Sequence, residues 1–130
     1  MQYSGAERRQ FKRVGASFTV IYRINSPITV RMMLGDKEID AIAMDLSEGG
    51  IAVLTKYEVL ASSTVSIKFM VFNDAAVSSQ KRSRSMEVQG EVRYCFTVKG
   101  GAYRLGIRFI DISADDRTFI ANFVKMSSLA

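Results

Sequence analysis

Two apolar runs of this 130-residue chain are joined by the stretch Ala43-Met44-Asp45-Leu46-Ser47-Glu48-Gly49-Gly50-Ile51-Ala52-Val53. Ser, Glu and paired Gly residues are ordinary turn chemistry, so the simplest interpretation is a corner between two strands. Because side chains alternate between the two faces of a strand, this stretch predicts two sets of orientations. Those predicted to point inward are Ile42, Met44 and Leu46, and those predicted to point outward are Ala43, Asp45 and Ser47. A carboxylate and a hydroxyl would then lie side by side, next to glycines that let a ligand approach the backbone.

The composition is that of one soluble globular domain, with 48% hydrophobic and 24% charged residues. No apolar run approaches the roughly 20 residues that cross a bilayer, so we expect no membrane span. The basic N-terminus lacks the apolar segment of a signal peptide, and the single Cys95 excludes an internal disulfide. These features predict a cytoplasmic protein.

The chain contains no histidine and one cysteine, which excludes Cys/His zinc sites and His-dependent nucleophilic catalysis. We therefore expect no enzyme activity, no metal and no cofactor. The net charge of +5 indicates an anionic partner, which could be a nucleotide, a nucleic acid or a membrane surface. A merely soluble basic protein would carry the same charge, so the charge does not choose among these.

The N-terminal segment is strongly basic and reads Glu7-Arg8-Arg9-Gln10-Phe11-Lys12-Arg13. It shows neither helical periodicity nor apolar alternation, so we predict a flexible arm over residues 1–16 before a single domain over residues 17–130. A solvated tail is the usual explanation of such a run. However, three of its four cations are arginines, whose planar guanidinium pairs with phosphate oxygens or stacks on a flat ring.

The rest of the chain is predicted to form short strands followed by one helix. Apolar alternation predicts strands over residues 17–24, 28–34, 39–46, 51–55, 64–71, 86–96 and 103–109. In the sixth of these, Tyr94 and Phe96 are predicted to point inward, Cys95 outward, and Gly90 to mark a bulge or kink. Residues 73–85 are predicted to be a polar loop. Ser113 is predicted to cap a helix over residues 113–126 that packs an apolar stripe on the sheet. This pattern indicates an antiparallel barrel or curled sheet.

In two motifs and a late strand the chain resembles the PilZ family of cyclic di-GMP receptors. Arg9-Gln10-Phe11-Lys12-Arg13 is similar to the family's RxxxR, and Asp45-Leu46-Ser47-Glu48-Gly49-Gly50 to its [D/N]xSxxG. Arg104-Leu105-Gly106-Ile107-Arg108-Phe109 looks like the family's late strand. The resemblance extends from about Glu7 to Val124. It implies an all-β fold, a six-stranded antiparallel, split-barrel-like β-barrel with a C-terminal α-helix.

The resemblance also implies that cyclic di-GMP binds on the outer surface of the barrel and that the arm folds over it. Arg9 and Arg13 would hold phosphates and guanines, and Asp45 would accept hydrogen bonds from a guanine. Many members that bind an intercalated ligand dimer have an arginine at the position of Arg8, so a two-ligand mode is implied too. The residues expected to bind the ligand are Arg8, Arg9, Arg13, Asp45, Ser47, Gly49, Gly50 and Arg108.

Three alternatives compete with a receptor. A nucleic-acid-binding barrel would use the arm and the basic residues Lys81, Arg82 and Arg84 of the predicted loop, but it gives Asp45 no role and the loop lacks interleaved aromatics. A family member that acts only as a protein adaptor would have broken motifs, and both motifs are intact here. An enzyme is disfavoured by the missing histidines. We expect a receptor whose arm orders on the ligand and presents a surface to a downstream protein partner.

Overall fold

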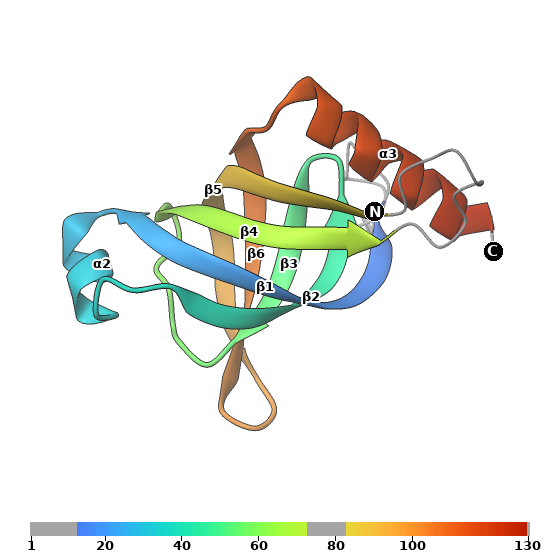
Figure 1. The fold of residues 1–130 in the computed structure, drawn as a ribbon. Helices are drawn as coiled ribbons and strands as arrows, with labels where there is room; N and C mark the ends of the chain where they lie inside the picture. The colour runs from blue at the N-terminus through green and yellow to red at the C-terminus, as the bar shows by residue number, and fades with distance from the viewer. Residues whose placement is uncertain (1–12, 73–82, 130) are drawn as a thin grey trace, which may run out of the picture.

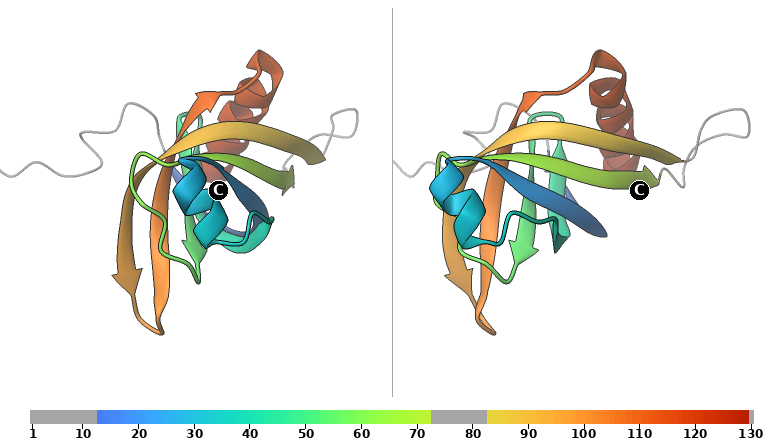
Figure 2. Two further views of the ribbon diagram at one scale, coloured as in Figure 1. Left: turned by 90° about the vertical axis from the view of Figure 1, so that its left-hand side faces the viewer. Right: turned by 60° about the vertical axis from the view of Figure 1, so that its left-hand side comes forward.

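The computed structural model describes residues 13–72 and 83–129, and within them the chain forms six strands and two helices. In chain order these are β1 (Val14–Ser26), α2 (Ile28–Met33), β2 (Ile39–Ser47), β3 (Gly50–Thr55), β4 (Thr64–Phe72), β5 (Ser83–Val98), β6 (Ala102–Asp111) and α3 (Ala114–Leu129). The strands close into an antiparallel barrel in the order β1-β2-β3-β6-β5-β4, with α3 lying across one end (Figures 1 and 2). The predicted six-stranded antiparallel barrel with a C-terminal helix is confirmed.

The barrel interior is filled by apolar side chains that alternate with more exposed ones along the strands. Fully buried examples are Tyr22, Leu46, Ile51, Ile67 and Leu105. Inside this core the Tyr22 hydroxyl and Thr55 Oγ1 form a hydrogen bond of 2.7 Å. Desolvation by burial is the largest effect on Tyr22 and raises its pKa to about 12. A buried hydroxyl is tolerated here because it has a partner.

Helix α3 begins and packs as predicted. The backbone N–H of Asp116 donates to Ser113 Oγ at 3.1 Å, which is the expected N-cap. Ile120 and Val124 are buried, and the neighbouring phenylalanines of the stripe pack against the core. Asp116 also accepts a hydrogen bond of 2.7 Å from Arg84 Nε, so the start of α3 is tied to β5. The helix runs to Leu129, three residues beyond its predicted end.

Residues 28–33 form helix α2, where a strand was predicted over residues 28–34. Apolar residues occur at every second position, but in the helix only Val30 is buried while Ile28 and Met32 are exposed. The helix is stabilised by contacts that alternation does not show. Asp36, which follows the helix, accepts hydrogen bonds from Nε of Arg31 in α2 and from Nη2 of Arg23 in β1. A short apolar run cannot be assigned to helix or strand by its periodicity alone.

The side-chain orientation predicted for β2 was wrong over most of the strand. Ala43 is buried and faces the core, whereas Ile42 and Met44 are exposed. The pairing of β2 with β3 shifts register between Ala43 and Asp45, and this irregularity brings Leu46 inward as predicted. Ser47, predicted to point outward, is only 2% exposed. Because apolar residues occur on both faces of this strand, the sequence did not show which face is buried.

The pairing of β5 with β6 is irregular at two places, and the second changes which side chains of β5 face the core. Its pairing with β6 shifts at Gly90, which confirms the predicted irregularity there, and shifts again between Val92 and Tyr94. After the second shift Cys95 packs against the core, so the predicted inward orientation of Tyr94 and Phe96 was wrong. Two strands also begin three residues earlier than predicted, β1 at Val14 and β5 at Ser83. The rest of the predicted loop, residues 73–82, lies outside the described residues.

Candidate ligand-binding site

A strip of residues, one from each of five strands, crosses the outer face of the barrel. Cross-strand pairing aligns Gly15 of β1, Asp45 of β2, Ala52 of β3, Gly106 of β6 and Tyr94 of β5. Between Asp45 and Tyr94 the strip carries nothing larger than a methyl group. Neighbouring strands are about 4.8 Å apart, so Asp45 and Gly106 are separated by two strand spacings, or about 10 Å. The strip therefore places a carboxylate and an aromatic ring at two ends of a row of small residues, of which Ala52 is buried and Gly106 lies beneath the Tyr94 ring.

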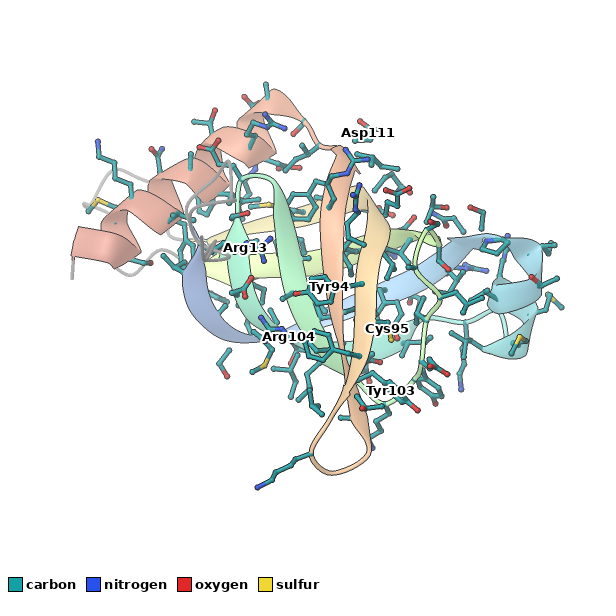
Figure 3. The ribbon with its side chains drawn as sticks, turned by 180° about the vertical axis from the view of Figure 1, so that it is seen from behind. Arg13, Tyr94, Cys95, Tyr103, Arg104 and Asp111 are labelled. Atoms are coloured by element: carbon teal, nitrogen blue, oxygen red, sulfur yellow. The ribbon has the colours of Figure 1, made fainter. Side chains whose placement is uncertain are left out.

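Asp45 is held between two arginines. Arg13 Nη1 donates to Asp45 Oδ1 at 3.3 Å, and Arg104 Nη2 donates to Asp45 Oδ2 at 2.7 Å. The three side chains are only 15–27% exposed, so water screens these pairs less than it screens surface pairs. Figure 3 shows Arg13, Arg104 and Tyr94 on the same side of the barrel. The structure thus brings together Arg13 and Asp45, two of the residues predicted from separate motifs.

Arg104 belongs to this site although the sequence prediction did not include it. The pKa of Arg104 is raised: desolvation, the largest single effect, lowers it, but the hydrogen bond with Tyr94 and the interactions with Asp45 outweigh desolvation. Arg104 thereby connects the two ends of the strip. A guanidinium has five N–H donors, so two such partners leave capacity for an oxyanion. Its signal in the sequence was its position two residues before Gly106, on the outer series of a strand that also carries Arg108.

The turn of the Asp45 motif is organised by its serine. The backbone N–H groups of Gly49 and Gly50 both donate to Ser47 Oγ at 3.2 Å. A Cβ at Gly50 would lie 2.3 Å from the carbonyl oxygen of Ile107, so β6 approaches too closely for any side chain. Both residues therefore have a structural role in the described chain, and their predicted contacts with a ligand remain predictions.

Arg108 lies on the outer face of β6, on the other side of Gly106 from Arg104. Its side chain is 52% exposed and donates to Glu91 at 3.4 Å. Four residues along a strand span about 13 Å, so the two arginines are cations on either side of the strip. Arg8 and Arg9 lie outside the described residues. Arg84, which the nucleic-acid alternative would use, pairs instead with Asp116.

The described residues offer neither a metal centre nor a membrane helix. Among residues 13–72 and 83–129, no group of three or more His, Cys, Asp or Glu side chains could hold a metal ion. No helix in the same ranges is long and apolar enough to cross a membrane. The site itself presents one carboxylate, several guanidinium groups and an aromatic ring, whose chemistry is hydrogen bonding and charge.

Comparisons with known proteins point to one family. The family model of the PilZ domain matches residues 7–125. The Bacillus subtilis inhibitor of motility MotI/DgrA is 19% identical, with a TM-score of 0.72 over 94% of this chain and 52% of its own. The PilZ domain of YcgR from Escherichia coli, solved with c-di-GMP, is 14% identical, with a TM-score of 0.62 over 94% of this chain and 92% of its own.

The K. pneumonia MrkH–c-di-GMP complex is 12% identical, with a TM-score of 0.64 over 94% of this chain and 53% of its own. The chain thus spans about half the length of the MotI/DgrA and MrkH chains. At such low identities these likenesses establish the fold alone. A comparison with curated protein sequences found no match.

Proposed function

Because this chain belongs to the PilZ domain family, we propose that it is a non-enzymatic cytoplasmic receptor for cyclic di-GMP, which binds across the strip. The observation that carries the proposal is Asp45, a carboxylate held on the outer face between Arg13 and Arg104. The solved YcgR domain and MrkH are both c-di-GMP complexes, which supports the same ligand here.

The ligand's functional groups match those of the strip. Cyclic di-GMP carries two guanines and two phosphates. A carboxylate can accept two parallel hydrogen bonds from the N1–H and amino group of one guanine, and guanidinium groups pair with phosphate oxygens or with guanine O6 and N7. Asp45 supplies the first chemistry, while Arg13, Arg104 and Arg108 supply the second.

Binding would proceed by exchange of partners at Asp45. The contact from Arg13 is the longer of its two, at 3.3 Å against 2.7 Å for Arg104. We propose that a guanine displaces Arg13, which then pairs with a phosphate, while Arg104 stays in place. Each charged group keeps a charged or hydrogen-bonding partner, so the exchange leaves no buried group unpaired.

The released Arg13 would transmit binding to the arm. Arg13 directly precedes β1, so its displacement moves the end of the arm. In this proposal Arg8 and Arg9 close over the ligand, Ser47, Gly49 and Gly50 contact it through the turn, and the ordered arm presents a surface to a partner protein. The ligand drives this change by the difference in its affinity for the two states. Binding of an intercalated ligand dimer, with Arg8 on the second molecule, belongs to the same proposal.

Calorimetric titration with cyclic di-GMP tests the site and gives the stoichiometry. Arg13→Ala and Asp45→Ala should each weaken binding by about 10- to 150-fold, which corresponds to the 1.5–3 kcal/mol of a charged hydrogen bond. Matched controls are Lys68→Ala and Glu38→Ala, which remove an exposed ion pair elsewhere on the barrel with the same changes of charge. Wild-type affinity in both site variants, or equal losses in the controls, would reject the site.

A further inference from the structure

Two aromatic rings lie on the outer face of β5 at one end of the strip. The rings of Tyr94 and Phe96 are stacked, with centroids 5.3 Å apart and planes inclined by 14°. Tyr94 lies directly on Gly106, where a Cβ would come within 1.9 Å of the ring. The position of Tyr94 therefore has a structural reason, because its ring covers a glycine. It does not explain Phe96, which is 50% exposed.

The aromatic pair is connected to Asp45 through Arg104. Phe96 pairs across the strands with Arg104, as Tyr94 does with Gly106. Arg104 donates to Asp45 at 2.7 Å, and Tyr94 is among the groups that raise its pKa. Asp45 and the backbone of Tyr94 are three strand spacings apart, about 14 Å, and the Tyr94 ring leans back over β6. A guanine that is hydrogen-bonded edge-on to Asp45 therefore leaves the aromatic end of the strip uncovered.

We propose that Tyr94 and Phe96 form a second base-binding site, on which the other guanine of the same cyclic dinucleotide stacks against Phe96. The inference rests on the proposed function and adds the recognition of the second base. A nucleobase suits these rings because every base has a flat π-face, and a stacked base gains about 1–3 kcal/mol. Arg104, between the two base sites, faces the ribose-phosphate ring that joins the guanines. Gly106 leaves room for the Tyr94 ring against β6, and the ribose-phosphate ring would pass above that ring.

Fluorescence gives a direct test because the chain contains no tryptophan. In a Phe96→Trp variant the indole is the sole tryptophan and occupies the proposed stacking position. Cyclic di-GMP should quench its emission, with a midpoint that matches the calorimetric affinity. A Phe72→Trp variant is the control, because Phe72 is also exposed, at 58%, but lies at the end of β4, away from the strip. Its emission should not change.

Affinity gives the second measurement. Phe96→Leu should weaken binding about 5- to 150-fold, the equivalent of one stacked base. Its urea midpoint should fall only slightly, since Phe96 is half exposed and Tyr94 is the ring on which it stacks. Phe72→Leu should bind as tightly as the wild type.

Each outcome separates the inference from the proposed function. One result would overturn the second base site and leave the receptor intact. In it the wild type binds tightly, Asp45→Ala loses affinity, and the Phe96 variants show neither quenching nor weaker binding. A stoichiometry of two ligands, with quenching that follows only the second, would overturn stacking by the same ligand molecule. No binding to the wild type would overturn both.

Discussion

Replacing Gly50 by alanine adds one methyl group and tests whether the packing of the barrel requires this glycine. It starts β3 and pairs with Arg108 of β6. A Cβ there would lie 2.3 Å from the carbonyl oxygen of Ile107 and 3.3 Å from its carbonyl carbon. Cβ atoms essentially never come closer than 3.0 Å to another heavy atom, so one of the two strands would have to move by about 0.7 Å. Because the obstacle is backbone in a closed barrel, it cannot rotate away.

The expected cost of Gly50→Ala follows from this contact. Overpacking of a core costs about 1–3 kcal/mol. Alanine would reduce the entropy of the unfolded chain and return about 0.4–1 kcal/mol of that. We therefore expect the free energy of unfolding to fall by about 1–2 kcal/mol. For a chain of this size each kcal/mol corresponds to roughly 4 °C, which gives a Tm lower by about 4–8 °C.

Urea unfolding followed by far-UV circular dichroism measures this change, with calorimetry for Tm. Gly15→Ala is the matched control, because nothing lies within 4 Å of a Cβ at Gly15. The control should be as stable as the wild type or slightly more stable. If Gly50→Ala unfolds at the same urea concentration as Gly15→Ala, the close approach of β6 does not require the glycine, and the reasoning is wrong.

Three other predictions concern the ring over Gly106, the buried tyrosine and the cap of α3. Gly106→Ala should lower the free energy of unfolding less than Gly50→Ala, because the Tyr94 ring can rotate away, and this rotation should change the near-UV circular dichroism of tyrosine. A larger loss of stability in urea than that of Gly50→Ala would contradict this. Burial raises the pKa of Tyr22 from 10.0 to about 12, so its contribution is fully present below pH 10 and is lost as the pH rises toward 12. The alkaline loss of stability should be on the order of 2–3 kcal/mol and smaller in Tyr22→Phe, and an unchanged alkaline curve in that variant would refute the assignment. Ser113→Ala should lower the free energy of unfolding by about 0.5–2 kcal/mol, as loss of an N-cap does, and wild-type urea stability would show that the cap contributes nothing.

Local patterns in the sequence predicted the strands and the terminal helix well. Period-two alternation holds over β4 and β6, where one face packs on the core, and Ser113 signals the start of α3 by chemistry confined to one helical turn. The same reasoning failed for α2. Met32 is exposed in this helix, so its apolar side chain does not mark a buried face. The reasoning also failed for β2, because Ile42 and Met44 put apolar residues on the outer face.

Arg104 shows the limit for the site. Its outward orientation could be predicted from the alternation of β6, but its contact with Asp45 joins residues 59 positions apart. That contact exists because β3 lies between β2 and β6, an order that only the closed barrel defines. Arg13 reaches the same carboxylate across 32 positions.

The sequence by itself determined the class of fold, the two motifs and therefore the family, because these depend on residue types and short spacings. Tertiary structure alone decided which side chains share the outer face. A shift of one residue in a strand moves its side chains to the opposite face, and irregularities in β2 and β5 make such shifts. The shift before Tyr94 turned two aromatic residues from the predicted core to the surface. Cross-strand register then aligned Tyr94 with Gly106, Ala52 and Asp45, and hydrogen bonding between distant strands, which no local pattern encodes, fixed that alignment.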